Sequence, residues 1–163
     1  MIRCGTGAAT VPFAQAVGEH GRVVGVDISE PMLAGARKRI AESGLGNVSL
    51  IEADAQFHPF EPDRFDLITS RFGVMFFADP VAAFRNVLPA ARPGGRLCFA
   101  CWAPLDQAAE QNPARAGNRI PKLVLCSVRD AALGHSKISF GAARWGWPTC
   151  SVAAQRGFIA GYP

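Results

Sequence analysis

Two glycines and an aspartate near the start of the chain have the types and spacing of a nucleotide-binding site. Gly5 and Gly7 lie in the stretch CGTGAAT, residues 4–10, which leads into an expected helix. Glycines there permit a tight turn and let backbone N–H groups approach a ligand at the start of a helix. Asp27 follows Gly7 by twenty positions, where a carboxylate can accept hydrogen bonds from both hydroxyls of a ribose. We therefore expect an adenosine-containing ligand.

A second acidic residue, Asp54, is followed by Ala55 in the stretch EADA. Its carboxylate can accept a hydrogen bond from an adenine amino group, while the next backbone N–H donates to the ring. Nicotinamide or flavin dinucleotides and S-adenosylmethionine both use a glycine turn with an acidic strand end. Thr10 stands where the dinucleotide fingerprint has a third Gly or Ala, and a second acidic strand end is unusual in a dehydrogenase. These residues favour S-adenosylmethionine and leave an NAD-dependent oxidoreductase as an alternative.

Helices and strands alternate strictly over the first 107 residues. Strands are expected at residues 22–28, 48–54, 65–70 and 96–102. Helices are expected at residues 7–21, 29–44 and 79–92. Such alternation predicts an α/β fold with a doubly wound parallel sheet and helices on both faces. In this fold a ligand binds beyond the carboxyl ends of the strands, where the glycines and aspartates lie.

Composition limits the class of protein. The chain has 163 residues with 49% hydrophobic content and can bury one core. Without a run of about 18 apolar residues or a secretory leader, it is expected to be cytoplasmic, with no membrane partner. Residues 1–107 hold ten Lys/Arg and eleven Asp/Glu, whereas residues 108–163 hold seven and two. The basic residues are scattered singly, so no nucleic-acid partner is expected.

The five cysteines have no disulfide-framework spacing, and their number is odd. Cys98 and Cys101 form a C-x-x-C pair in an expected strand, where a separation of three points the side chains to opposite faces. We expect buried thiols and no metal site. His58 and Arg71 lie near strand ends and can act as a base or a substrate clamp. However, a lone histidine in a turn is usually structural, and no catalytic residue is predicted.

Together these motifs resemble the class I S-adenosylmethionine-dependent methyltransferases, in particular the small bacterial type similar to quinone-biosynthesis methyltransferases. The matching stretches are CGTGAAT, VVGVDISEPML, EADAQFHPF, FDLITSRFGVMFF, DPVAAFRNVLPAARPGGRL and CW, in family order over residues 4–102. The resemblance implies S-adenosyl-L-methionine as the cofactor, a small-molecule methyl acceptor and a Rossmann-like sheet. It also implies a cofactor-binding set: Gly5 and Gly7 at the methionine portion, Asp27 at the ribose, Ile28, Met32, Asp54 and Ala55 at the adenine, and Ser70 beside the cofactor.

Two departures from the family pattern bear on these expectations. The family has an acidic residue and a further glycine before Cys4 and Gly5, where this chain has Met1, Ile2 and Arg3. We expect the first, central strand to be lacking, so that a slot with unpaired backbone groups separates the strands at residues 22–28 and 65–70.

The second departure follows residue 107, where the family pattern is no longer recognisable. Residues 108–163 are expected to be a basic tail that does not complete the sheet, although KLVLCSV can form one strand. Residues 1–107 are then a partial S-adenosylmethionine-binding domain truncated at its N-terminus. An inactive methyltransferase fragment or a binding module is the alternative function.

Overall fold

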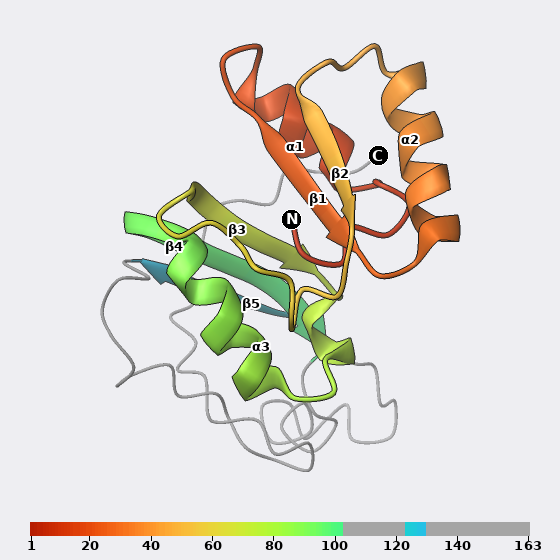
Figure 1. Cartoon of the computed structure of the whole chain (residues 1–163). Coiled ribbons are helices and arrows are strands. Elements are labelled where there is room, and N and C mark those ends of the chain that lie inside the picture. Colours follow the sequence, from red (N-terminus) through yellow and green to blue (C-terminus); the bar gives the residue numbers. More distant parts are fainter. Residues whose placement is uncertain (103–122, 130–163) are drawn as a thin grey trace, which may run out of the picture.

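The computed structural model describes residues 1–102 and 123–129. Its elements are α1 (Thr10–Val17), β1 (Val23–Asp27), α2 (Glu30–Glu42), β2 (Val48–Glu52), β3 (Phe65–Arg71), the 3-10 helix η1 (Val74–Phe76), α3 (Pro80–Val87), the 3-10 helix η2 (Leu88–Ala90), β4 (Ala91–Trp102) and β5 (Leu123–Arg129). Strands β1 and β2 form a parallel pair, and β3, β4 and β5 form a second sheet (Figure 1). The β3–β4 pair is parallel and the β4–β5 pair is antiparallel. The expected α/β fold with parallel strands is confirmed.

Local sequence signals set the helix boundaries. α1 ends at Gly18, whose φ of 69° is readily adopted by glycine. α2 begins after Ser29, and α3 begins after Asp79, whose carboxylate accepts a backbone N–H of the first turn at 3.0 Å. α3 ends at Val87 and does not continue to residue 92 as expected. Pro89 explains the difference, because it has no N–H to donate to the helix, and the chain passes instead into the short 3-10 helix η2 before β4 begins.

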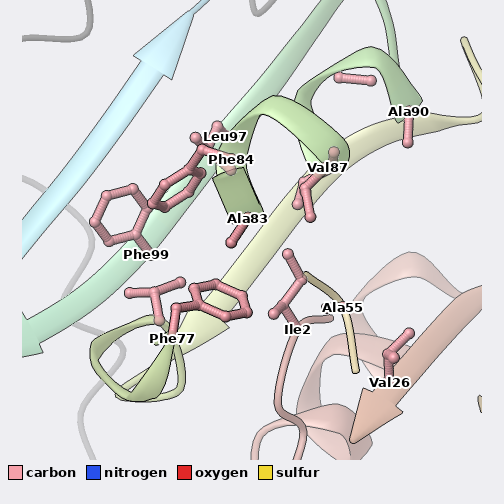
Figure 2. Packing of buried hydrophobic residues seen from close by; sticks show 13 residues of the cluster. Ile2, Val26, Ala55, Phe77, Ala83, Phe84, Val87, Ala90, Leu97 and Phe99 are labelled. Atoms are coloured by element: carbon pink, nitrogen blue, oxygen red, sulfur yellow. The ribbon is translucent and has the colours of Figure 1, made fainter. Parts of the chain in front are cut away.

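One apolar core joins the two sheets. Phe84 of α3 packs on Phe99 of β4 with ring centroids 5.5 Å apart, and Phe77 meets Phe84 edge to face at 6.3 Å. Ile2 and Val26 belong to the same buried cluster. Figure 2 shows Ile2 between Val26 of β1 and the side chains of α3. The first residues of the chain therefore connect the β1–β2 pair to the core beneath α3.

Residues 1–4 lie between β1 and β3 and bond to both strands (Figure 1). The Ile2 N–H donates to Thr69 O of β3 at 2.8 Å, and Met1 O accepts the Val26 N–H of β1 at 2.9 Å. Ile2 also forms a parallel bridge with Val26. The expectation of an open slot is therefore wrong for its carboxyl-end half, where four residues pair with both neighbours in the manner of a strand end.

The other half of the slot is a small apolar pocket. Because the Val26 N–H faces residues 1–4, strand alternation turns the Val24 N–H toward the same slot. The pocket is lined by Met1, Ile2, Val24, Val26, Phe60, Phe65, Leu67, Ile68, Val87 and Ala90. Apolar side chains on an added extended segment would find a matching surface here.

In a chain that begins at Met1, the terminal ammonium is expected to make stability depend on pH. Burial lowers the pKa of this ammonium from 8.0 to about 6, and the nearby Cys4 opposes the change. The unfolded chain then binds more protons than the folded chain between pH 6 and 8, so stability rises with pH across this window and is lost as the pH falls. Relative to an N-terminally acetylated chain, the free energy of unfolding should rise by about 2 kcal/mol from pH 6 to 8. If the free energy of unfolding changed with pH by the same amount in the acetylated and the non-acetylated chain, this expectation would be wrong.

Strand β5 confirms the one strand that the sequence allowed within residues 108–163, at KLVLCSV. It pairs antiparallel with Arg96–Trp102, placing Leu97 opposite Val128 and Cys101 opposite Val124. The stretch KLVLCSV is rich in strand-forming residues, which favours a strand there. The remainder of the expected basic tail lies outside the described residues.

Two further expectations can be compared with the structure: one concerns the cysteines of β4 as thiols or metal ligands, and the other concerns helices that could cross a membrane. Cys98 and Cys101 are half-buried, and burial raises the pKa of the Cys98 thiol. Across residues 1–102 and 123–129, no group of three or more metal-ligating side chains gathers. Over the same residues, no helix has the length and apolar character needed to cross a membrane.

Candidate functional site

The carboxylate of Asp27 ties the glycine loop to the end of β1. Its Oδ2 accepts the Gly5 N–H at 2.8 Å, and its Oδ1 accepts the Ser29 N–H at 3.0 Å. Asp27 is only 7% exposed, so both charge-assisted hydrogen bonds are sheltered from water. The structure thus brings together Gly5 and Asp27, the pair that sequence spacing assigned to one site.

Gly5 and Gly7 both adopt left-handed backbone conformations, with φ of 55° and 75°. At Gly7 there is also little room, because an added Cβ would lie 3.2 Å from the Cβ of Ala36 in α2. At Gly5 no atom lies within 4 Å of an added Cβ, apart from its chain neighbours. Gly7 therefore packs the loop closely against α2, while Gly5 leaves open space beside the Asp27 carboxylate.

The substitution Gly7→Ala is expected to destabilise the fold by about 1 to 2 kcal/mol through its left-handed backbone, with a further loss from the contact with α2. Gly44→Ala is the matched control, because Gly44 has φ of 65° but open space around its added Cβ. Urea denaturation measures both variants. Equal losses at the two positions would show that the loop does not pack tightly on α2.

The thiol of Cys4 lies beside the same carboxylate and is buried. Burial and then the negative charge of Asp27 raise the pKa of Cys4 to about 11. The thiol is therefore protonated near neutral pH, and a protonated thiol is a poor nucleophile. Cys4 is accordingly not suited to act as a nucleophile in covalent catalysis at this loop.

The expected adenine side of the site combines open apolar side chains with a carboxylate. Ile28 and Met32, after β1, are 50% and 47% exposed although both are large and apolar. Asp27 pairs with Glu52 across the β1–β2 ladder, so Asp54 follows the end of β2 on the same edge of the sheet. An apolar surface with a hydrogen-bond acceptor nearby suits a flat ring carrying an amino group.

The turn after β2 is held by a residue that the sequence did not single out. Asn86 of α3 donates through Nδ2 to Ala55 O at 3.0 Å and to His58 O at 2.8 Å. Asp54 closes the same turn by accepting the Gln56 N–H at 2.9 Å. The only sequence signal for Asn86 is a polar residue beside the apolar positions of an amphipathic helix. Ala55 is 3% exposed, so this turn is rigidly placed against the core.

Ser70 and His58 have local structural contacts. Ser70 is 3% exposed, and its hydroxyl donates to Ile2 O at 2.9 Å, which fixes the entrance of the glycine loop. The His58 ring packs edge to face on Phe60 at 4.7 Å between ring centroids. Arg71, the last residue of β3, is exposed. Of the residues expected at the site, Ser70 is therefore next to the loop, but its hydroxyl already holds the backbone.

Known proteins match both the sequence and this arrangement. A family model described as a methyltransferase domain matches residues 2–95. The chain is 36% identical over 130 residues to the ubiquinone/menaquinone biosynthesis C-methyltransferase UbiE of Proteus mirabilis, covering 78% of this chain and 52% of that protein. It is 37% identical over 96 residues to the demethylmenaquinone methyltransferase of Shouchella clausii, covering 59% of this chain and 41% of that protein.

Solved structures show the same fold. An S-adenosylmethionine-dependent methyltransferase from Mesorhizobium loti is 33% identical, with a TM-score of 0.53 over 64% of this chain and 46% of that one. A methyltransferase structure from Bacillus halodurans is 28% identical, with a TM-score of 0.58 over 66% of this chain and 46% of that one. The chain spans about half the length of the curated relatives it matches.

Proposed function

Because this chain belongs to the class I S-adenosylmethionine-dependent methyltransferase family, we propose that it binds this cofactor at the carboxyl ends of β1 and β2 and transfers its methyl group to a small-molecule acceptor. The relatives named above as quinone-biosynthesis enzymes make a quinone-type ring the proposed class of acceptor. One observation carries the proposal for the site: the Asp27 carboxylate lies at the strand end and holds the glycine loop by the Gly5 N–H.

The residues at this edge fit the chemical groups of S-adenosylmethionine. Each carboxylate oxygen of Asp27 accepts one backbone N–H and retains a further lone pair that can accept from a ribose hydroxyl. The open space at Gly5 admits a chain such as the methionine portion. The half-exposed Ile28 and Met32 can cover one face of the adenine ring, with Asp54 as an acceptor at its edge.

When bound, S-adenosylmethionine supplies a methyl group already activated by its sulfonium sulfur. The work left to the protein is to hold donor and acceptor in line and to exclude water. In the proposed site, the loop of Gly5 and Gly7 orients the methionine portion, and Asp27 fixes the ribose. No general base is assigned, in agreement with the neutral thiol of Cys4.

Isothermal titration calorimetry with S-adenosylmethionine and with NAD tests the proposal. We expect heat of binding for S-adenosylmethionine and none for NAD at the same concentrations. Binding of NAD alone would overturn the proposal and favour the oxidoreductase that the spacing of Gly5, Gly7 and Asp27 also allowed. A methyl-transfer assay with a demethylated quinone then separates an enzyme from the alternative, a binding module, which would bind the cofactor without turnover.

A further inference from the structure

Arg3 holds a backbone conformation that is unfavourable for its residue type. Its φ is 48°, in the left-handed region that Gly5 and Gly7 also adopt. A residue with a Cβ is disfavoured there by steric contact with its own backbone. Arg3 stands two positions before Gly5, at the entrance of the glycine loop. A long cationic side chain in such a place needs contacts that support it.

The structure provides three supporting contacts for the Arg3 side chain. Gly73 makes room for it, because an added Cβ on Gly73 would collide with the Arg3 Cβ. Nη2 of Arg3 donates to Phe76 O at 3.2 Å. The guanidinium carbon lies 5.7 Å from the centre of the Phe77 ring, within the range of a cation–π contact. The cation is thereby held between the glycine loop and η1.

The guanidinium retains hydrogen-bond donors for a ligand. It has five N–H groups in a planar fork, and its hydrogen bond to the Phe76 carbonyl uses one nitrogen of that fork. Within residues 1–102, the ion pairs join other basic residues to carboxylates, and Arg3 takes part in none of them. Its side chain is only partly buried. An arginine fork without an acidic partner, beside an open loop, suits a carboxylate ligand.

We propose that Arg3 binds the α-carboxylate of the methionine portion of S-adenosylmethionine. This inference rests on the proposed function, which seats the methionine portion at Gly5 and Gly7. The family pattern has an acidic residue and a glycine where this chain has Met1 and Arg3. Arg3 therefore stands at the position of the family's glycine, so its cationic side chain is an addition of this chain, and a cation at the loop entrance favours recognition of a carboxylate.

Two ligands that differ in this carboxylate test the proposal by calorimetry on the full chain. S-adenosylhomocysteine carries the α-carboxylate, whereas 5′-methylthioadenosine has the same adenosine and sulfur without the amino-acid group. Arg3→Gly is the main variant, because glycine suits the left-handed backbone and leaves the loop free to fold. This variant should lower the affinity for S-adenosylhomocysteine about 10- to 150-fold, as expected for loss of a hydrogen bond between charged groups. The affinity for 5′-methylthioadenosine should stay unchanged.

Arg37→Met is the matched control, because it removes an exposed arginine that pairs with Glu30 on α2 and should change neither affinity. If Arg3→Gly lowered the affinity for both ligands equally, the inference would be overturned, and the role of Arg3 would be to support the loop. Tighter binding of S-adenosylhomocysteine would also overturn it, because Arg3 would then obstruct the site. If the unmodified chain binds neither ligand, the proposed function is wrong, and the inference that rests on it is wrong as well. Arg3→Lys keeps the positive charge without the planar fork, so it should retain part of the preference for S-adenosylhomocysteine over 5′-methylthioadenosine.

Discussion

A chain that carries an extended apolar segment ahead of Met1 is expected to be several kcal/mol more stable than residues 1–163 and to bind S-adenosylmethionine more tightly. The pocket between β1 and β3 is lined by apolar side chains. Each large side chain buried there adds about 1.5 to 3 kcal/mol, and ladder hydrogen bonds to both strands add about 1 kcal/mol each. Fixing the backbone costs about 1 to 2 kcal/mol per residue, so the gain exceeds the cost.

Tighter binding follows from the same contacts. The segment continues directly into residues 1–4, which carry the glycine loop between β1 and β3. Fixing that entry reduces the conformational freedom that a ligand must otherwise remove. It also replaces the buried ammonium of Met1, whose pKa burial lowers to about 6, by a neutral peptide group.

The matched control is a Gly/Ser extension of equal length, which removes the terminal charge but leaves the pocket empty. Chemical denaturation compares the two extended chains with residues 1–163, and calorimetry compares their affinities. The chain with the apolar extension should be more stable than the chain with the Gly/Ser extension and should bind S-adenosylmethionine more tightly. Equal stabilities for the two extensions would show that the pocket does not accept a strand.

Asp27→Ala is expected to cause the largest loss of affinity among single substitutions at the site. Hydrogen bonds to a charged group contribute about 1.5 to 3 kcal/mol, and the ribose loses its proposed partner. The variant also frees the Gly5 and Ser29 N–H groups, which the carboxylate holds at 2.8 and 3.0 Å. Because the loop loses its tie, we expect reduced stability together with reduced affinity.

Two further variants separate these effects. Asp66→Ala removes an exposed carboxylate that pairs with Arg92, and it should leave affinity unchanged. Asp27→Asn preserves the shape of the side chain but has one oxygen, so it should retain part of the loop contact. Affinity of Asp27→Ala equal to that of the unmodified chain, measured by calorimetry, would mean that the ribose lies elsewhere.

The sequence predicted the parts of the fold that depend on local pattern. The alternation of elements, the capping position of Asp79 and the common location of Gly5 and Asp27 all follow from residue types at short or regular spacing. The helix expected up to residue 92 ends at Val87, because Pro89 has no N–H for a helical hydrogen bond.

Features that depend on pairing between distant segments were not predictable in this way. Residues 1–4 are too few to show a strand pattern, yet they bond to both β1 and β3. Ser70 reaches Ile2 across 68 positions, and Asn86 reaches Ala55 across 31. Such contacts depend on which elements pack together, and the sequence of either partner alone carries little signal for them.

A crystal structure with S-adenosylhomocysteine bound would show whether the cofactor site lies at Asp27 and the glycine loop. We expect both ribose hydroxyls to lie within about 2.5 to 3.0 Å of the Asp27 carboxylate oxygens. We also expect the amino-acid portion to lie along the loop of Gly5 and Gly7, with its carboxylate at the Arg3 guanidinium. A ligand bound with its ribose away from Asp27 would show that the proposed site is wrong.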